Sequence, residues 1–208
     1  MNKDFIEVKK NLVMTTLWVS GQESGYSWTL ASRLGLFLHE AEKRYGKRQI
    51  EWTLLGIEFC EGNDRSQIWY PFAEDKSIIV QLSAEAARNE TLAFSQLAYE
   101  SVHLLAPVGK TEKVSVLEEG LAILFSEDGA VYGYASHENF GSDGVGKEAA
   151  GLVKSLLEVD GDGIKKLRAQ EGFFYQMTQD TFQKAGVSAP PDLINALLAD
   201  YDDLRAKE

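Results

Sequence analysis

Two apolar segments with a helical period, close together near the middle of the chain, limit the fold more than any other feature. The first begins at Asn89, a residue type that caps helices well, and ends before Pro107. The second opens with Ser115-Val-Leu-Glu118, the pattern of a capping box, and extends to about Phe125. Because both segments are largely apolar and their link is short, we expect two neighbouring helices within the core.

Elements of other kinds are predicted on either side of this helix pair. Upstream, the sequence predicts a helix over Ser27–Tyr45 and then strands at Ile50–Cys60, Gln67–Tyr70 and Ser77–Leu82, with Gly56 a candidate bulge. Downstream, after a glycine-rich stretch over Asp128–Gly146, helices are expected at roughly 147–159, 162–171, 178–185 and 191–206. Strands and helices are segregated along the chain, so the fold class is α+β.

The size of the chain suits one domain. Its 208 residues are too few for two ordinary domains. We therefore expect a single domain over 1–208, with the first helix, the sheet and the helix pair in 1–126 and a loop and helices in 127–208. The lone Cys60 is expected to be a buried small hydrophobe. The sequence has no apolar run of membrane-spanning length and no signal-peptide pattern, so we expect a cytoplasmic protein.

The net charge limits the partners. Lys and Arg total 21 and Asp and Glu total 32, which gives −11 and disfavours nucleic-acid binding. The acidic residues are unevenly distributed. Between Lys113 and Lys147 there are six acidic residues and no basic one. This stretch includes the second helix of the pair, so a cation or a cationic partner stays open.

The first helix of the pair carries the pattern Tyr99-Glu-Ser-Val-His103. In the related pattern H-E-x-x-H, two histidines one helical turn apart bind one zinc ion, and the glutamate acts as general base on a zinc-bound water. Here Glu100 holds the position of the base and His103 that of the second ligand. A phenol, Tyr99, stands at the position of the first ligand.

With the helix that follows, this pattern resembles the active site of gluzincin metallopeptidases. The sequence Glu119-Gly-Leu-Ala122 is similar to their E-G-x-A turn, so the resemblance implies a zincin-like fold with Glu119 as third zinc ligand and Glu118 left to the capping box. It also implies that the strand before the helix pair is an edge strand that lines a peptide-binding cleft. Candidates for that cleft are Ile79, Gln81 and, from the glycine-rich stretch, His137.

Two departures from the family weaken the predicted zinc site. Tyr99 binds zinc only after losing a proton whose usual pKa is about 10. Ile123 stands where many relatives have an acidic residue that orients a ligand histidine, and an apolar side chain cannot do this. The sequence therefore favours a site without zinc or another cofactor, in an inactive protein that binds a peptide or protein in the cleft as a binding or regulatory module.

Two other interpretations remain open. One is an active zinc hydrolase in which His103, Glu119 and either Tyr99 or His137 hold the metal and Glu100 is the base. The other is an α+β interaction protein unrelated to peptidases. In a zinc-free site, Glu100 and Glu119 need partners, and Tyr99 and a protonated His103 are the expected ones.

Overall fold

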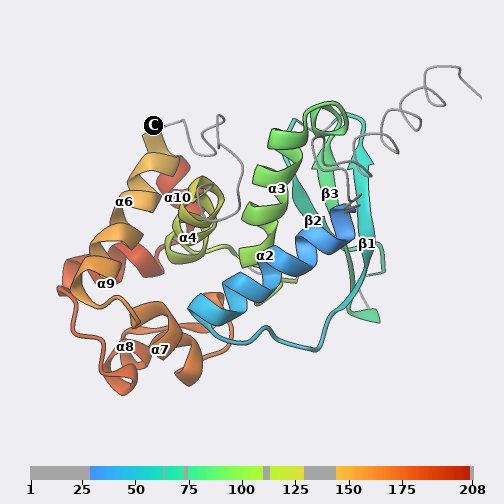
Figure 1. Cartoon of the computed structure of the whole chain (residues 1–208). Coiled ribbons are helices and arrows are strands. Elements are labelled where there is room, and N and C mark those ends of the chain that lie inside the picture. Colours follow the sequence, from blue (N-terminus) through green and yellow to red (C-terminus); the bar gives the residue numbers. More distant parts are fainter. Residues whose placement is uncertain (1–28, 63, 73–74, 110–112, 129–143, 207–208) are drawn as a thin grey trace, which may run out of the picture.

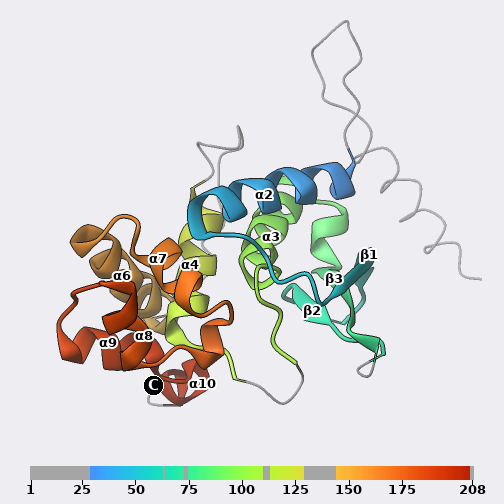
Figure 2. The same ribbon diagram turned by 90° about the horizontal axis from the view of Figure 1, so that it is seen from below.

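A three-stranded sheet and a group of C-terminal helices lie on opposite sides of one central helix, α3 (Glu90–His103) (Figure 1). The computed structural model describes residues 29–62, 64–72, 75–109, 113–128 and 144–206. Seen from below, the same order is clear: the sheet lies on one side of α3, and α4 (Val116–Glu127) begins the helical side (Figure 2). The fold is α+β, as the sequence predicts.

The first described helix, α2 (Leu30–Tyr45), packs across α3 (Figure 1). It starts with a capping box, in which the Thr29 hydroxyl accepts a hydrogen bond from the backbone N–H of Ser32 and the Ser32 hydroxyl accepts one from the backbone N–H of Thr29. Its buried side chains repeat every three or four residues and include Leu34, Phe37 and Ala41. This period gives α2 one apolar face, which accounts for its place on the core.

The sheet has the strand order β1 (Thr53–Cys60), β3 (Ser77–Ser83), β2 (Gln67–Trp69). Strand β3 pairs parallel with β1 and antiparallel with β2. The register of β1 shifts between Leu54 and Gly56, which confirms an irregularity at the predicted place. The expectation that the strand before the helix pair is an edge strand is wrong. Strand β3 is central and almost wholly buried, because both of its edges are paired.

The helix pair forms as predicted. Helix α3 is capped by the side chain of Asn89 and α4 by that of Ser115. Most side chains of both helices are buried, since α3 is covered by α2, the sheet and α4. Helix α4 also touches α6 (Gly144–Val159) at Gly120. A Cβ added there would stand 2.3 Å from the backbone oxygen of Ala149, so no larger residue fits this crossing.

The C-terminal part is helical, with one difference from expectation. Three helices are close to their predicted bounds: α6, α7 (Gly163–Gln170) and α8 (Gln179–Ala185). The single helix expected over 191–206 is instead α9 (Pro191–Leu198) and α10 (Tyr201–Arg205). The break occurs because Ala199 accepts a hydrogen bond from the backbone of Val116 at 2.9 Å, and the backbone of Tyr201 donates one to Val114 at 3.0 Å.

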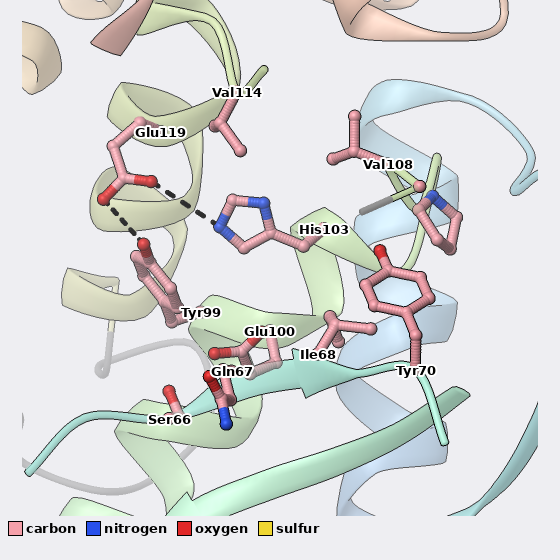
Figure 3. Close-up of a pocket in the computed structure, with 12 residues that line it drawn as sticks. Ser66, Gln67, Ile68, Tyr70, Tyr99, Glu100, His103, Val108, Val114 and Glu119 are labelled. Carbon is pink, nitrogen blue, oxygen red and sulfur yellow. Dashed lines mark hydrogen bonds and ion pairs between the residues drawn. The ribbon is translucent and has the colours of Figure 1, made fainter. Parts of the chain in front are cut away.

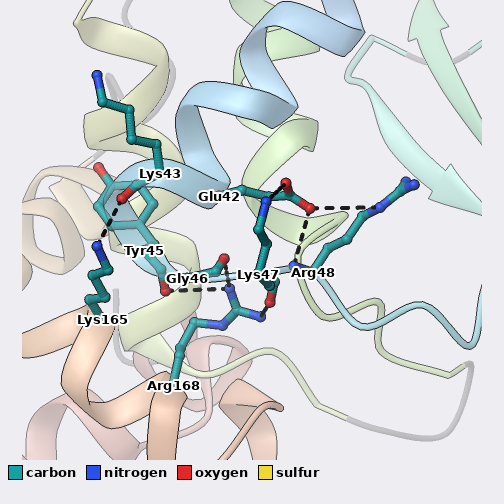
Figure 4. A network of polar contacts seen from close by, with 8 residues as sticks. All are labelled: Glu42, Lys43, Tyr45, Gly46, Lys47, Arg48, Lys165 and Arg168. Carbon is teal, nitrogen blue, oxygen red and sulfur yellow. Dashed lines mark hydrogen bonds and ion pairs between the residues drawn. The ribbon is translucent and has the colours of Figure 1, made fainter.

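A buried arginine of α7 joins the two ends of the fold (Figure 4). The guanidinium of Arg168 donates hydrogen bonds to the backbone carbonyls of Gly46 and Lys47, both at 2.9 Å, and of Leu105 at 3.0 Å. Only 6% of Arg168 is exposed. The end of α2, the segment after α3 and the C-terminal helices are therefore held by one side chain.

One main cluster of buried apolar side chains runs through the fold. It takes members from both predicted parts of the chain, from Leu34 on α2 to Leu197 on α9. Cys60, expected to be buried, is half-buried because it ends β1, the outer strand on that side of the sheet. Among the described helices, none has the length and apolar character needed to cross a membrane.

Candidate functional site

A pocket of about 290 Å³ opens between β2, α3 and the start of α4 (Figure 3). Helices α3 and α4 supply its ionisable acid and imidazole groups, β2 and its neighbours supply both polar and apolar side chains, and the segments that follow α3 supply apolar ones. The residues that line it are Ser66, Gln67, Ile68, Tyr70, Tyr99, Glu100, His103, Pro107, Val108, Gly109, Val114 and Glu119.

Helix α3 directs three polar side chains to this pocket. Tyr99 and His103 are one helical turn apart, and their rings meet edge to face with centroids 4.9 Å apart. Glu100 lies beside them, next to Gln67 at the start of β2 (Figure 3). The structure therefore brings together the three positions that the sequence pattern singled out on this helix.

Helix α4 brings Glu119 to the same place. The hydroxyl of Tyr99 donates a hydrogen bond to Oε1 of Glu119 at 2.6 Å. Nε2 of His103 lies 3.8 Å from Oε2 of the same carboxylate (Figure 3). The predicted convergence of Tyr99, His103 and Glu119 is confirmed, and Tyr99 and His103 are the partners expected for Glu119 in a zinc-free site.

Glu118 is a site residue that the sequence interpretation assigned elsewhere. Its backbone N–H does donate to Oγ of Ser115 at 3.2 Å, so half of the predicted capping box exists. Its side chain does not complete the box. It turns inward, and its Oε1 lies 2.8 Å from Nδ1 of His103. The Glu118 side chain is fully buried, so it supports His103 from behind.

Glu100 is the most buried carboxylate that lines the pocket. It is 1% exposed, and within the described part of the chain its Oε1 has no hydrogen-bond partner. Burial raises the pKa of Glu100 to about 7, although the charge of His103 and the nearby Ser66 hydroxyl lower it. The negative charges of Glu119 and Glu118 raise it further.

His103 and Tyr99 both hold their protons strongly. Burial lowers the pKa of His103, but the hydrogen bond and charge of Glu118 and the charges of Glu100 and Glu119 raise it to about 9. Burial and the adjacent Glu119 raise the pKa of the Tyr99 phenol well above its usual value. At neutral pH the site therefore holds an imidazolium and a neutral phenol.

This donor set does not fit a zinc ion. Tyr99 keeps its proton and donates it in a hydrogen bond to Glu119, so the neutral phenol is not a ligand. The contact of Nδ1 of His103 with Glu118 leaves Nε2 as the ring nitrogen for a metal ion, as in sites where a carboxylate orients a ligand histidine. Among the described residues, Nε2 of His103 and Oε2 of Glu119 then remain as ligands that face each other, where a catalytic zinc ion needs three protein ligands. Within the residues that the structure describes, no group of three or more His, Cys, Asp and Glu side chains is arranged to hold a metal ion.

The other predicted cleft residues lie elsewhere. Ile79 and Gln81, on the central strand, do not line the pocket. Gln81 instead donates a hydrogen bond to Glu58 and accepts one from Gln67 within the sheet, both at 2.6 Å. His137 lies outside the described residues.

The sequence interpretation missed the wall of the pocket. That wall is β2 with the residues on either side of it, including Ser66, Ile68 and Tyr70, and the segment after α3, including Val108. The strand has three residues, so its alternation is too short to show that it lies at an edge. Its place beside β3 follows from pairing between distant segments, for which a local pattern gives no signal.

The described residues supply a proton acceptor but not a complete set of metal ligands. Glu100, with a pKa of about 7, can accept a proton, and among the described residues the site has no third ligand for a metal ion that would activate a water. It does combine buried carboxylates with an apolar wall. Comparisons of the chain with protein-family models, curated proteins and solved structures found no match.

Proposed function

We propose that this protein is a peptide-binding module of gluzincin-like, zincin-type architecture, in which Tyr99 replaces the first zinc ligand and the site binds without cleaving. Three features support this: the turn of α3 with Tyr99, Glu100 and His103, the approach of Glu119 from α4, and the carboxylate behind His103. The resemblance to the peptidase motif accounts for the first two, and the contact of Glu118 with His103 adds to them.

The hydrogen bond between Tyr99 and Glu119 is the observation that carries the proposal. At 2.6 Å, the phenol donates its proton in a hydrogen bond to an oxygen of Glu119 that would otherwise be free to bind a metal ion. The raised pKa of Tyr99 means that this proton is not released near neutral pH. The tyrosine therefore does more than remove a ligand, because it also engages the ligand that remains on α4.

The place proposed for the peptide is the outer edge of β2. In the described part of the chain, β2 pairs with β3 alone, and Gln67 and Ile68 line the pocket. An extended peptide can add to such an edge by backbone hydrogen bonds, with side chains entering the neighbouring pocket. This edge replaces β3, the strand that the sequence suggested.

Zinc binding tests the assignment of the site. The variant Tyr99→His places two imidazoles one turn apart beside Glu119 and frees the glutamate from its hydrogen bond. We expect calorimetry at neutral pH to show tight one-to-one zinc binding by this variant and no stoichiometric binding by the unmodified protein. The variant Tyr99→Phe is the matched control, since it frees Glu119 without adding a ligand.

Two outcomes would contradict the proposal. If the unmodified protein binds zinc tightly and Tyr99→Phe loses it, the phenolate is a ligand and the protein is an active hydrolase candidate with Glu100 as base. If Tyr99→His binds no zinc, the gluzincin-like assignment fails. The protein is then better described as an α+β interaction protein without peptidase ancestry.

A further inference from the structure

The pocket contains a buried carboxylate oxygen that lacks a donor. Oε1 of Glu100 is without a hydrogen-bond partner in the described residues, although only 1% of Glu100 is exposed. A buried acceptor left unpaired lowers the stability of the protein, and more so when it carries charge. The nearest open space is the pocket that Glu100 lines, so a donor that enters there can remove this cost.

The side chains around Glu100 leave negative charge in excess. Three carboxylates, those of Glu100, Glu118 and Glu119, share one imidazole, His103. The hydrogen bonds of His103 and Tyr99 are already directed to Glu118 and Glu119. None of the described residues that line the pocket is a lysine or an arginine. Among the described residues, the negative charge at the pocket is therefore not fully balanced.

The apolar part of the lining favours a cation that is carried on an apolar chain. Besides the carboxylates, the lining contains the side chains of Ile68, Val108 and Val114 and the ring of Tyr70 (Figure 3). An alkyl stem with a charged end matches this mixed lining, because the stem can pack on the apolar side chains while the end reaches the carboxylates. A bare metal ion would leave the apolar wall unused.

We propose that the pocket binds the ammonium group of a lysine side chain from the bound peptide, with Glu100 and Glu119 as its acceptors. This inference rests on the proposed peptide binding at β2 and names the side chain that this binding selects. An ammonium group has three donors, and the hydroxyl oxygen of Ser66, which also lines the pocket, is the third acceptor. The lysine takes the position that a zinc ion takes in a catalytic site of this kind.

Two blocked pentapeptides test the inference: acetyl-Ala-Ala-Lys-Ala-Ala-amide and its norleucine analogue. The two differ in the charged end and share the alkyl stem. Amide NMR signals of Gln67, Ile68 and Glu119 report binding at β2 and at the pocket. We expect the lysine peptide to bind at least about tenfold more tightly, since a hydrogen bond to a buried charged group contributes about 1.5–3 kcal/mol.

Charge-removing variants locate the effect. Glu100→Gln and Glu119→Gln should each lose most of the preference for lysine. The amide oxygen of Glu119→Gln can still accept from Tyr99, so this variant keeps the helix contact if Glu100→Gln folds poorly. Glu158→Gln, on the exposed surface of α6, is the matched control and should keep the full preference.

The outcomes separate this inference from the proposed function. If both peptides shift the β2 signals with equal affinity, peptide binding stands and the lysine assignment is overturned. If neither peptide shifts them at millimolar concentration, both are overturned. A preference for lysine that survives in Glu100→Gln and Glu119→Gln also overturns the assignment, because the ammonium then binds elsewhere.

Discussion

Tyr99 supplies the hydrogen-bond donor that stabilises the carboxylate of Glu119 within the site. Its hydroxyl neutralises part of the charge of Glu119 in a largely buried place. We predict that Tyr99→Phe lowers the free energy of unfolding by about 1–3 kcal/mol, because Glu119 then loses a donor and the ring remains. Urea unfolding followed by circular dichroism measures this change.

The control is Tyr175→Phe, whose hydroxyl accepts one exposed hydrogen bond from Gln176. We expect it to change the free energy of unfolding by less than about 0.5 kcal/mol. Equal effects of the two substitutions would mean that the hydrogen bond between Tyr99 and Glu119 contributes nothing to stability.

The stability of the protein should depend on pH through His103. Its pKa is raised from 6.5 in the unfolded chain to about 9 in the folded one. The folded state therefore holds the proton more strongly, and this stabilisation is complete below pH 6.5 and lost as the pH rises through about 9. Glu100 acts in the same direction at lower pH, because its pKa rises from 4.5 to about 7.

We predict that the urea concentration at the unfolding midpoint decreases as the pH rises from 6.5 to 9. In the His103→Gln variant, this decrease with pH should be smaller. Glu100→Gln should flatten the part of the pH curve between pH 4.5 and pH 7 and leave the upper part. A His103→Gln protein with the same decline above pH 6.5 would show that the imidazole is not the titrating group.

Spacing along one helix made most of the site predictable. Tyr99, Glu100 and His103 share a face because of the helical repeat, and the motif resemblance selected Glu119. Glu118 was not predictable, because the pattern from Ser115 to Glu118 explains it equally well as a local cap. Its side chain turns to His103 only because α3 lies against this end of α4.

At the scale of elements, the contact between α4 and α6 explains why a glycine, Gly120, follows Glu119 in the motif. The glycine after Glu119 lies where α4 and α6 cross, and the backbone oxygen of Ala149 occupies the space of a Cβ. We predict that Gly120→Ala lowers the free energy of unfolding by about 1–3 kcal/mol, because the two helices must separate. Urea unfolding again provides the measurement.

Gly151, on an exposed position of α6, is the matched control. A Cβ added there meets nothing within 4 Å. Gly151→Ala should raise the free energy of unfolding by up to about 1 kcal/mol, because alanine favours the helix. If Gly120→Ala is also stabilising, the close helix contact is not required and the glycine has another role.

The positions of helices and strands could be predicted from local patterns, but their pairing could not. The strands at Thr53–Cys60, Gln67–Trp69 and Ser77–Ser83 are near their predicted bounds. Their order depends on which segments meet in space, and β3 became central instead of lying at an edge. The break at Ala199 has the same cause, since its partner is Val116 on a distant helix.

At the scale of the whole molecule, Arg168 connects the parts of the fold. We predict that Arg168→Met lowers the free energy of unfolding by about 3 kcal/mol or more, because the carbonyls of Gly46 and Lys47 lose their donors. Arg168→Lys should restore little of this, since one amine cannot replace the planar fork of donors. Thermal and urea unfolding should agree.

The comparison residue is Arg205, exposed on α10. We expect Arg205→Met to change the free energy of unfolding by no more than about 0.5 kcal/mol. A similar loss in both variants would mean that general charge removal, and not the carbonyl contacts of Arg168, destabilises the protein.

The short pairing of Ala199 and Tyr201 with the start of α4 affects how the chain folds during synthesis. The backbone of Val116 and Val114 finds these partners only after the ribosome has released the C-terminal residues. Domains are made from the N-terminus, at about 5–20 residues per second. The helix that carries Glu118 and Glu119 must therefore wait several seconds for these contacts at its first turn.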